Sequence, residues 1–244
     1  MTWHVTPDRF LSLWTAAGND EFPFPLRYRS ASMWEDEYDA DRHAADEWRR
    51  QLADPRLDHA IRILQAGELA VEMYGNAGTA DIRVRGGKEG AFAVLARQYA
   101  SGDIQIVPIQ SSILARAVVA QIPAAPRGHE QARAASIREL TEPTATTSVR
   151  QQIGESEPRA LRRLLLRDRS GAGSIRLLAP NAHGRLTTES DIGWFDVVDD
   201  GRYMFSPGTD TRVVPATNDI LREELDRRID RARARRRQDA PTPW

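Results

Sequence analysis

The apolar residues in the N-terminal part of the chain recur with a helical period, broken by proline and glycine. Thr6 followed by Pro7 is typical of a helix start, with the side chain of Thr6 as the cap. Two prolines among alternating Phe and Leu at residues 21–26 cannot continue a helix, so this segment is expected to lie extended over the core. The predicted elements are a strand at residues 3–5 and helices from 7 to about 18, 31–52 and 55–66.

From residue 69 onward the pattern changes to an alternation of apolar and polar positions. Four short alternating runs separated by turn residues predict an antiparallel meander, with Gly86-Gly87-Lys88-Glu89-Gly90 as a flexible hairpin loop. A helix over about 110–122 should follow. A second meander occurs later in the chain, again followed by a helix, from about Pro215 past Ile229. The predicted strands are residues 69–74, 81–85, 91–99 and 104–107, then 174–178, 192–198, 202–205 and 211–214.

The two meanders are separated by a stretch rich in Ala, Thr, Pro and Gln at residues 124–156. We interpret it as a partly mobile connector that carries one weak helix over residues 131–140. A short basic helix at residues 159–167 then precedes the second meander.

The junction between meander and helix occurs twice, 107 positions apart. Val107-Pro108 corresponds to Val214-Pro215, and the apolar stripe of each following helix matches at the same offset. Two such units would hide their bare sheet faces by sharing one sheet flanked by helices. We therefore predict a pseudo-two-fold α/β (α+β) fold in a single domain, 1–244. Its halves are residues 1–123 and 157–230, joined by the connector 124–156 and followed by an Arg-rich tail at 231–244. The matching apolar pairs are Ile113 with Ile220, Leu114 with Leu221, Val118 with Leu225 and Ile122 with Ile229.

The composition is that of a globular, water-soluble protein. Hydrophobic residues make up 41% of the 244 positions, and the formal net charge is −1, so no overall field draws the chain to nucleic acid or to an anionic membrane. Cysteine is absent, which excludes disulfides, thiolate catalysis and cysteine-based zinc sites. No signal peptide and no apolar run of membrane-spanning length are found, so we expect a cytoplasmic protein without membrane insertion.

The polar residues form no pattern typical of catalysis. None of the five histidines lies three or four positions from another, so no helical pair of metal ligands is present. Asp199-Asp200-Gly201 is typical of a tight turn, and Asp196 is expected to point outward from its strand. The glycine-rich segment at residues 86–90 joins two strands and opens no helix, unlike a phosphate loop. We predict no catalytic, cofactor-binding or metal-binding residues and no enzymatic activity.

Two segments could bind a macromolecule. The Arg-rich stretch from Arg227 to Arg237 is interpreted as a solvated helix end, because the rest of the chain cancels its charge and no aromatic platform accompanies it. The basic helix at residues 159–167 carries Leu161, Leu164 and Leu165 on one face. This face is either buried against another helix or binds a partner.

Several short motifs, in order and spacing, resemble the EspG family, the cytosolic chaperones associated with ESX (type VII) secretion in actinobacteria. The resemblance spans nearly the whole chain, and the connector and the Arg-rich tail depart from it. The motifs are Phe10-Leu11-x-Leu13-Trp14, Phe22-Pro23-Phe24-Pro25-Leu26, Ser174-Ile175-Arg176-Leu177, Gly193-Trp194-Phe195-Asp196, Asp200-Gly201-Arg202-Tyr203-Met204 and Val213-Val214-Pro215-Ala216.

The resemblance implies a quasi-two-fold body with helical bundles beside a central sheet and no catalysis. Family members hold the aggregation-prone tip of PE/PPE-type secretion substrates in the cytoplasm before export. A similar holdase or adaptor is expected here, with a secreted PE/PPE-like or related helical-hairpin protein as partner and no particular oligomeric state implied. We place the groove for the apolar helical tip on the 159–167 helix, the 215–229 helix and adjoining loops. The candidate residues are Leu161, Arg162, Leu165, Leu166, Gly86, Gly87, Lys88, Arg222 and Leu225.

Two other functions stay open at this point. A nucleic-acid-associated regulator would use the Arg-rich C-terminal helix, and removal of residues 230–244 would then abolish binding that depends steeply on salt. A degenerate scaffold or immunity-like protein would have no export role. Neighbouring genes for an ESX ATPase or PE/PPE-like proteins would favour the chaperone.

Overall fold

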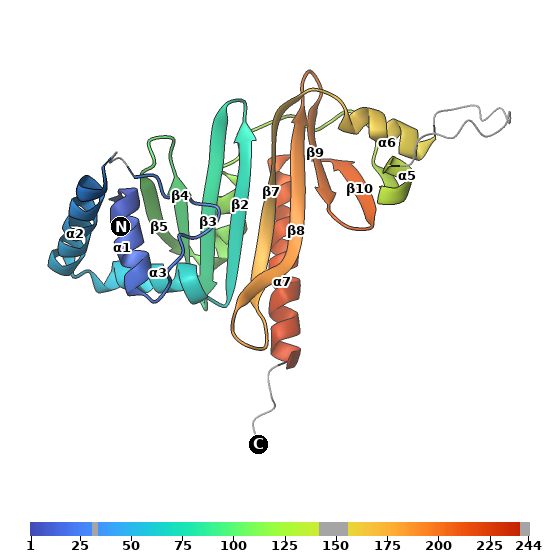
Figure 1. Ribbon diagram of the computed structural model, residues 1–244. Coiled ribbons are helices and arrows are strands. Elements are labelled where there is room, and N and C mark those ends of the chain that lie inside the picture. The colour runs from blue at the N-terminus through green and yellow to red at the C-terminus, as the bar shows by residue number, and fades with distance from the viewer. Residues whose placement is uncertain (31–33, 142–155, 240–244) are drawn as a thin grey trace.

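The computed structural model describes residues 1–30, 34–141 and 156–239, and its central feature is one ten-stranded sheet (Figure 1). The strand order is β1-β5-β4-β3-β2-β7-β8-β9-β10-β6, and neighbouring strands are antiparallel throughout. The strands are β1 (Trp3–Val5), β2 (Leu69–Ala77), β3 (Ala80–Glu89), β4 (Phe92–Gln98), β5 (Ile104–Gln110), β6 (Arg133–Ser136), β7 (Arg169–Pro180), β8 (Leu186–Val197), β9 (Gly201–Ser206) and β10 (Asp210–Pro215).

The strand order is symmetric about the seam between β2 and β7. Strands β2 to β5 follow one another outward on one side and β1 forms the edge, while β7 to β10 and β6 repeat this order on the other side. At the seam Gly75 pairs with Gly173, where a Cβ on either residue would lie 2.5 Å from a backbone oxygen of the opposite strand. This arrangement confirms the predicted pseudo-two-fold fold with a largely antiparallel sheet.

One face of the sheet carries the helices that close the two halves, α4 (Leu114–Val119) and α7 (Asn218–Asp239). Leu114 and Val118 of α4, like Leu221 and Leu225 of α7, are at most 1% exposed. The offset of 107 positions aligns these residues. The repeat in the sequence therefore corresponds to the residues that pack on this face of the sheet. The first of these helices is shorter than predicted: residues 111–113 form a 3₁₀ turn, and β5 continues past Pro108 to Gln110.

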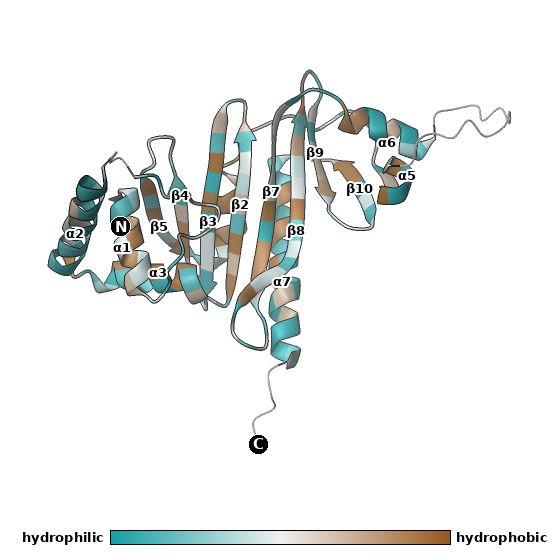
Figure 2. Ribbon diagram, in the orientation of Figure 1, coloured by the Kyte–Doolittle hydropathy of each residue, from teal (hydrophilic) through white to brown (hydrophobic). Residues whose placement is uncertain are grey.

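The opposite face carries two separate groups of helices. Helices α1 (Pro7–Ala16), α2 (Glu35–Leu52) and α3 (Pro55–Ala66) lie on the first half, and α5 (Ile137–Thr141) and α6 (Glu157–Leu165) lie on the second (Figure 1). The neighbouring residues Trp194 and Phe195 of β8 illustrate the two faces, because Trp194 packs with α7 and Phe195 packs with α6. Figure 2 shows apolar residues concentrated on the strands, whereas α2 is mostly polar.

Two of the N-terminal helices start where the sequence predicts. The hydroxyl oxygen of Thr6 accepts a hydrogen bond from the backbone N–H of Arg9 at 3.3 Å, and Pro7 occupies the first turn of α1. The carboxylate of Asp54 caps α3 in the same way, accepting from the N–H of Arg56 at 2.9 Å. Each cap comes from the residue directly before its helix, and the Asp54 carboxylate also accepts a hydrogen bond from the Trp3 indole N–H at 3.0 Å.

The prediction of a flexible loop at residues 86–90 is wrong. Gly86, Gly87 and Lys88 lie inside β3 and are buried, and the hairpin turn is at Gly90, whose φ is +56°. A Cβ on Gly87 would lie 2.2 Å from the carbonyl oxygen of Ile63, near the end of α3. Glycine occurs here because α3 approaches the strand closely, and not because the chain turns.

The connector also differs from its prediction. Residues 133–136 form β6, which pairs with β10, so the predicted helix over 131–140 is wrong in this part and only α5 is helical. Strand β6 supplies the edge of the second half, as β1 does for the first. The Thr-rich motif at residues 144–147 lies outside the described residues.

The most specific motif of the sequence forms a buried network between β8 and β9. Arg202 is 0% exposed and donates to both carboxylate oxygens of Asp196, at 2.7 Å each. Arg202 also donates to the carbonyl oxygen of Pro123, at 2.9 Å, and to the side chain of Asn218 at the start of α7. The prediction that Asp196 points outward is therefore wrong: it is 9% exposed because it pairs with a buried cation.

The predicted turn at Asp199-Asp200-Gly201 is present, and Asp200 anchors it. Burial raises the pKa of Asp200, but hydrogen bonds from the His129 backbone N–H (2.7 Å), the Tyr203 hydroxyl (2.9 Å) and the Arg167 guanidinium lower it, so the pKa lies below its usual value. Burial and the neighbouring carboxylate raise the pKa of Tyr203 to about 12. The carboxylate therefore has a structural role in holding the turn to the 126–130 segment.

Candidate functional site

The two helices assigned to one groove by the sequence lie on opposite faces of the sheet. Helix α6 packs on Phe195, Val197 and Tyr203, whereas α7 packs on Ile192 and Trp194. No single groove can therefore be lined by both helices, and this part of the prediction is wrong. The sequence could not reveal the error, because the face on which a helix packs depends on how the chain crosses the sheet.

The candidate residues of α6 differ sharply in exposure. Leu161 is 0% exposed and belongs to the core of the second half, and Leu165 packs partly against it. Arg162 donates hydrogen bonds to the carbonyl oxygens of Glu139 and Leu140, which ties α6 to α5. Leu166, just after the helix, is 79% exposed, so it is the apolar member of this group that is open to solvent.

The remaining candidates are mostly internal. Leu225 lies on the side of α7 that faces the sheet and is fully buried, and Gly86, Gly87 and Lys88 are buried in β3. Arg222 is partly exposed but lies near three carboxylates of its own helix, at 3.6 to 4.0 Å. These positions shape the core and the helix surface and contribute little area that a partner could contact.

The sheet surface between the two helix groups, which we call the central face, exposes aromatic rings and a guanidinium. It is formed by Phe24, Tyr74, Arg83, Arg176 and Asp191. Figure 1 shows β2 and β7 lying here without a helix in front of them in the described part of the chain. Phe24 is 45% and Tyr74 is 36% exposed, and their ring centres are 6.1 Å apart. Large half-exposed rings on an otherwise covered sheet are typical of a binding surface.

Cations hold these rings in place from both sides. The guanidinium carbon of Arg83 lies 4.8 Å from the centre of the Tyr74 ring, and that of Arg176 lies 5.1 Å from the Phe24 ring. Arg83 is fixed by a 2.9 Å hydrogen bond to the carbonyl oxygen of Pro25. The rings are thus preorganised, which lowers the entropy that binding would cost.

Two carboxylates near the rings, Glu72 and Asp191, have raised pKa values. Glu72 pairs with Arg85 at 2.6 Å below the surface, and burial raises the pKa of Glu72 despite the nearby Arg85 and Arg176. Asp191 lies 3.8 Å from Arg176, burial raises its pKa, and its Oδ1 atom has no hydrogen-bond partner within the described residues. The central face therefore offers apolar rings and one half-exposed cation, whereas the unpaired Asp191 oxygen lies buried beneath it.

The described residues contain no group of three potential metal ligands and no helix that could cross a membrane. The ionisable groups near the central face form ion pairs with each other. This arrangement favours binding through shape, apolar area and charge.

A sequence model described as the EspG family matches residues 6–227 of the chain. The chain belongs to the EspG family. Its fold is similar to that of the type VII secretion system chaperone EspG5 of Mycobacterium tuberculosis, solved in complex with the PE25-PPE41 dimer. The TM-score is 0.64 at 15% sequence identity, covering 94% of this chain and 96% of that chain. No curated protein sequence matches.

The EspG family match ends inside α7 at Arg227, so the last Arg-rich turns lie beyond it. The family motifs also divide into two kinds in the structure. Trp194, Arg202 and Tyr203 are at most 1% exposed and build the fold, whereas Phe24 is half-exposed on the central face. The family assignment does not support a nucleic-acid-associated regulator.

Sequence reasoning missed most of the central face. Phe24 was seen only as part of an extended segment over the core, and Tyr74 only as the end of a strand. The available signal was the alternation of β2, which places Glu72, Tyr74 and Asn76 on one side of the sheet. What alternation cannot show is that this side remains uncovered near the seam.

Proposed function

We propose that this protein is a cytoplasmic chaperone of type VII secretion, which binds a PE/PPE-like helical substrate and keeps its apolar tip soluble before export. Membership of the EspG family and the fold shared with EspG5, a chaperone solved with a PE-PPE dimer, support this function. The protein acts by binding and has no catalytic step. A scaffold with no export role would share the fold but would bind no such substrate.

The observation that carries the proposal is the central face. Phe24 and Tyr74 come from distant parts of the chain, yet their rings meet at 6.1 Å above the seam. An apolar helical tip would bury both rings, and an acidic residue beside that tip would pair with Arg176. Leu166 at the end of α6 is a separate exposed apolar side chain on the second half. Aromatic and arginine side chains of this kind dominate binding energy at protein interfaces.

The test is co-expression with a PE/PPE-like pair encoded in the same genome, followed by co-purification and titration calorimetry. Tyr74→Ala should weaken binding by about 2 kcal/mol, roughly thirtyfold in Kd, because it removes a ring from the centre of the surface. Arg176→Glu should weaken binding further by placing a negative charge opposite the acidic residue beside the apolar tip.

Tyr99→Ala is the matched control. Tyr99 is 37% exposed and lies under Arg97 at 4.8 Å, so it reproduces the exposure and the cation contact of Tyr74 without being part of the Phe24–Tyr74 ring pair. The control should bind the substrate normally. Equal binding by all variants would place the substrate elsewhere on the protein, and no complex with the parent chain would reject the chaperone function.

A further inference from the structure

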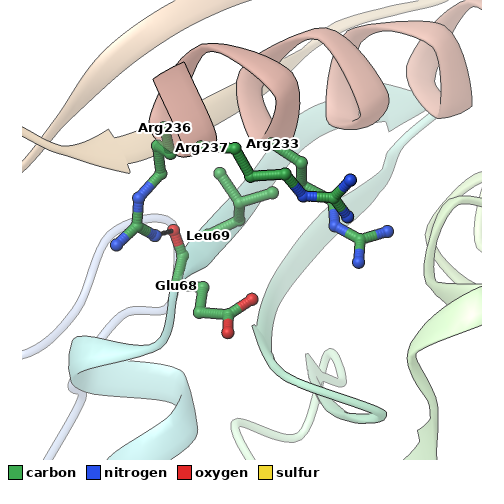
Figure 3. Close-up of a pocket in the computed structure, with 5 residues that line it drawn as sticks. All are labelled: Glu68, Leu69, Arg233, Arg236 and Arg237. Carbon is green, nitrogen blue, oxygen red and sulfur yellow. Dashed lines mark hydrogen bonds between the residues drawn. The ribbon is translucent and has the colours of Figure 1, made fainter. Parts of the chain in front are cut away.

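The last turns of α7 form a basic hollow that the chaperone function does not use. Arg233, Arg236 and Arg237 line it together with Glu68 and Leu69 at the start of β2, and its volume is about 340 Å³. Figure 3 shows the guanidinium groups of Arg233 and Arg237 close together, while Arg236 reaches the backbone carbonyl of Glu68. The hollow lies on the α7 face, opposite the central face.

Two of these arginines have neither a hydrogen-bond partner nor an ion-pair partner among the described residues. Arg235 pairs with Glu189 and Arg236 with a carbonyl oxygen, but Arg233 and Arg237 make no such contact within residues 1–30, 34–141 and 156–239. Lys88, 2% exposed, adds a further cation below, and Glu68 lies 4.0 Å from its amine. Burial and the nearby Arg233 lower the pKa of Lys88, while the carboxylates of Glu68 and Asp230 act in the opposite direction.

The arginines are held on a rigid base. Ile229 and Ala232 of the same helix are buried against the sheet, at 6% and 2% exposure, so the helix is anchored up to the residue before Arg233. Residues four positions apart lie about 5–6 Å from each other on a helix face, which sets the spacing of Arg233 and Arg237. Cations also stabilise a helix C-terminus through its dipole, but that effect requires neither a hollow nor this spacing.

We propose that this hollow binds the carboxylates of an acidic segment of a second protein. Each guanidinium can hold one carboxylate by two parallel hydrogen bonds, and Leu69 offers an apolar contact for the aliphatic part of the same side chains. A nucleic acid fits less well, because the lining residues include no aromatic ring on which its bases could stack. Since the hollow and the central face are on opposite sides of the sheet, both partners can bind at once.

The test uses a fluorescein-labelled twelve-residue peptide with glutamates four positions apart and leucines between them. Fluorescence anisotropy with the full-length protein measures its Kd at low and moderate salt. Replacing both Arg233 and Arg237 with glutamine should weaken binding at least about tenfold, because two charge-assisted hydrogen-bonding groups are lost. The matched control replaces Arg227 and Arg231 with glutamine. It removes the same charge from the same helix outside the hollow, and should weaken binding less than about threefold.

Three results would overturn the proposal. Equal weakening by the two double variants would show that the peptide responds to the overall positive charge of the helix and not to a site in the hollow. Tighter binding of a single-stranded oligonucleotide, lost in the Arg233→Gln/Arg237→Gln variant, would assign the hollow to nucleic acid. Displacement of the peptide by inorganic phosphate at concentrations equal to those of the peptide would assign it to a free small anion. Circular dichroism of both variants confirms that each remains folded.

Discussion

The buried Arg202 side chain joins the two halves of the molecule, so its replacement gives the sharpest test of the fold. Arg202→Met leaves the Asp196 carboxylate without its cation, and the carbonyl oxygen of Pro123 without its donor. Removing one partner of a buried ion pair costs about 3–5 kcal/mol. For a protein of this size each kcal/mol lowers Tm by about 2–4 °C, so Tm should fall by roughly 6–20 °C.

Urea denaturation followed by circular dichroism measures the free energy of unfolding, and a thermal melt measures Tm. The control is Arg212→Met on the neighbouring strand β10, where the arginine is exposed. The control should change the free energy of unfolding by no more than about 0.5 kcal/mol. The difference between the two variants isolates the contribution of burial and pairing from that of the lost positive charge.

A double variant decides whether the cause is the unpaired carboxylate. Adding Asp196→Asn to Arg202→Met removes the buried negative charge, so the double variant should be more stable than Arg202→Met alone. If Arg202→Met costs less than about 1 kcal/mol, or if the two changes simply add, then the network does not hold the halves together and the reasoning is refuted.

Three further predictions concern packing and pH. Gly87→Ala should lose about 1–3 kcal/mol in urea denaturation because its Cβ would meet a carbonyl oxygen at 2.2 Å, whereas Gly208→Ala, with nothing nearer than 3.9 Å, should not. Leu161→Ala should cost about 2–5 kcal/mol in the same assay and Leu166→Ala less than about 0.5, because their exposures are 0% and 79%; equal losses would contradict the assignment. Since the pKa of Asp200 is lower in the folded state, its stabilisation is fully present above the unfolded value of about 4 and is lost as pH falls through the folded pKa. Asp200→Asn should therefore be less stable than the parent at pH 7, and this difference should shrink below pH 4 in urea titrations at each pH.

The spacing of apolar residues along the chain was enough to predict the repeat and the type of most elements. A strand alternates its side chains with a period of two and a helix with a period of 3.6, so apolar spacing reports local structure directly. The offset that aligns Leu114 with Leu221 and Val118 with Leu225 therefore predicts the pseudo-two-fold fold. Thr6 and Pro7 fixed a helix start for an equally local reason.

The positions of glycines, helices and edge strands relative to one another depend on contacts between distant parts of the chain. The sequence around Gly87 is typical of a turn, but the glycine is needed because α3 packs closely against it. Residues 133–136 form a strand because β10 offers an unpaired edge. Phe24 and Tyr74 meet only because the chain crosses the sheet between them. Such contacts join residues distant in sequence, and local spacing carries no information about which of them will be neighbours or which face will stay uncovered.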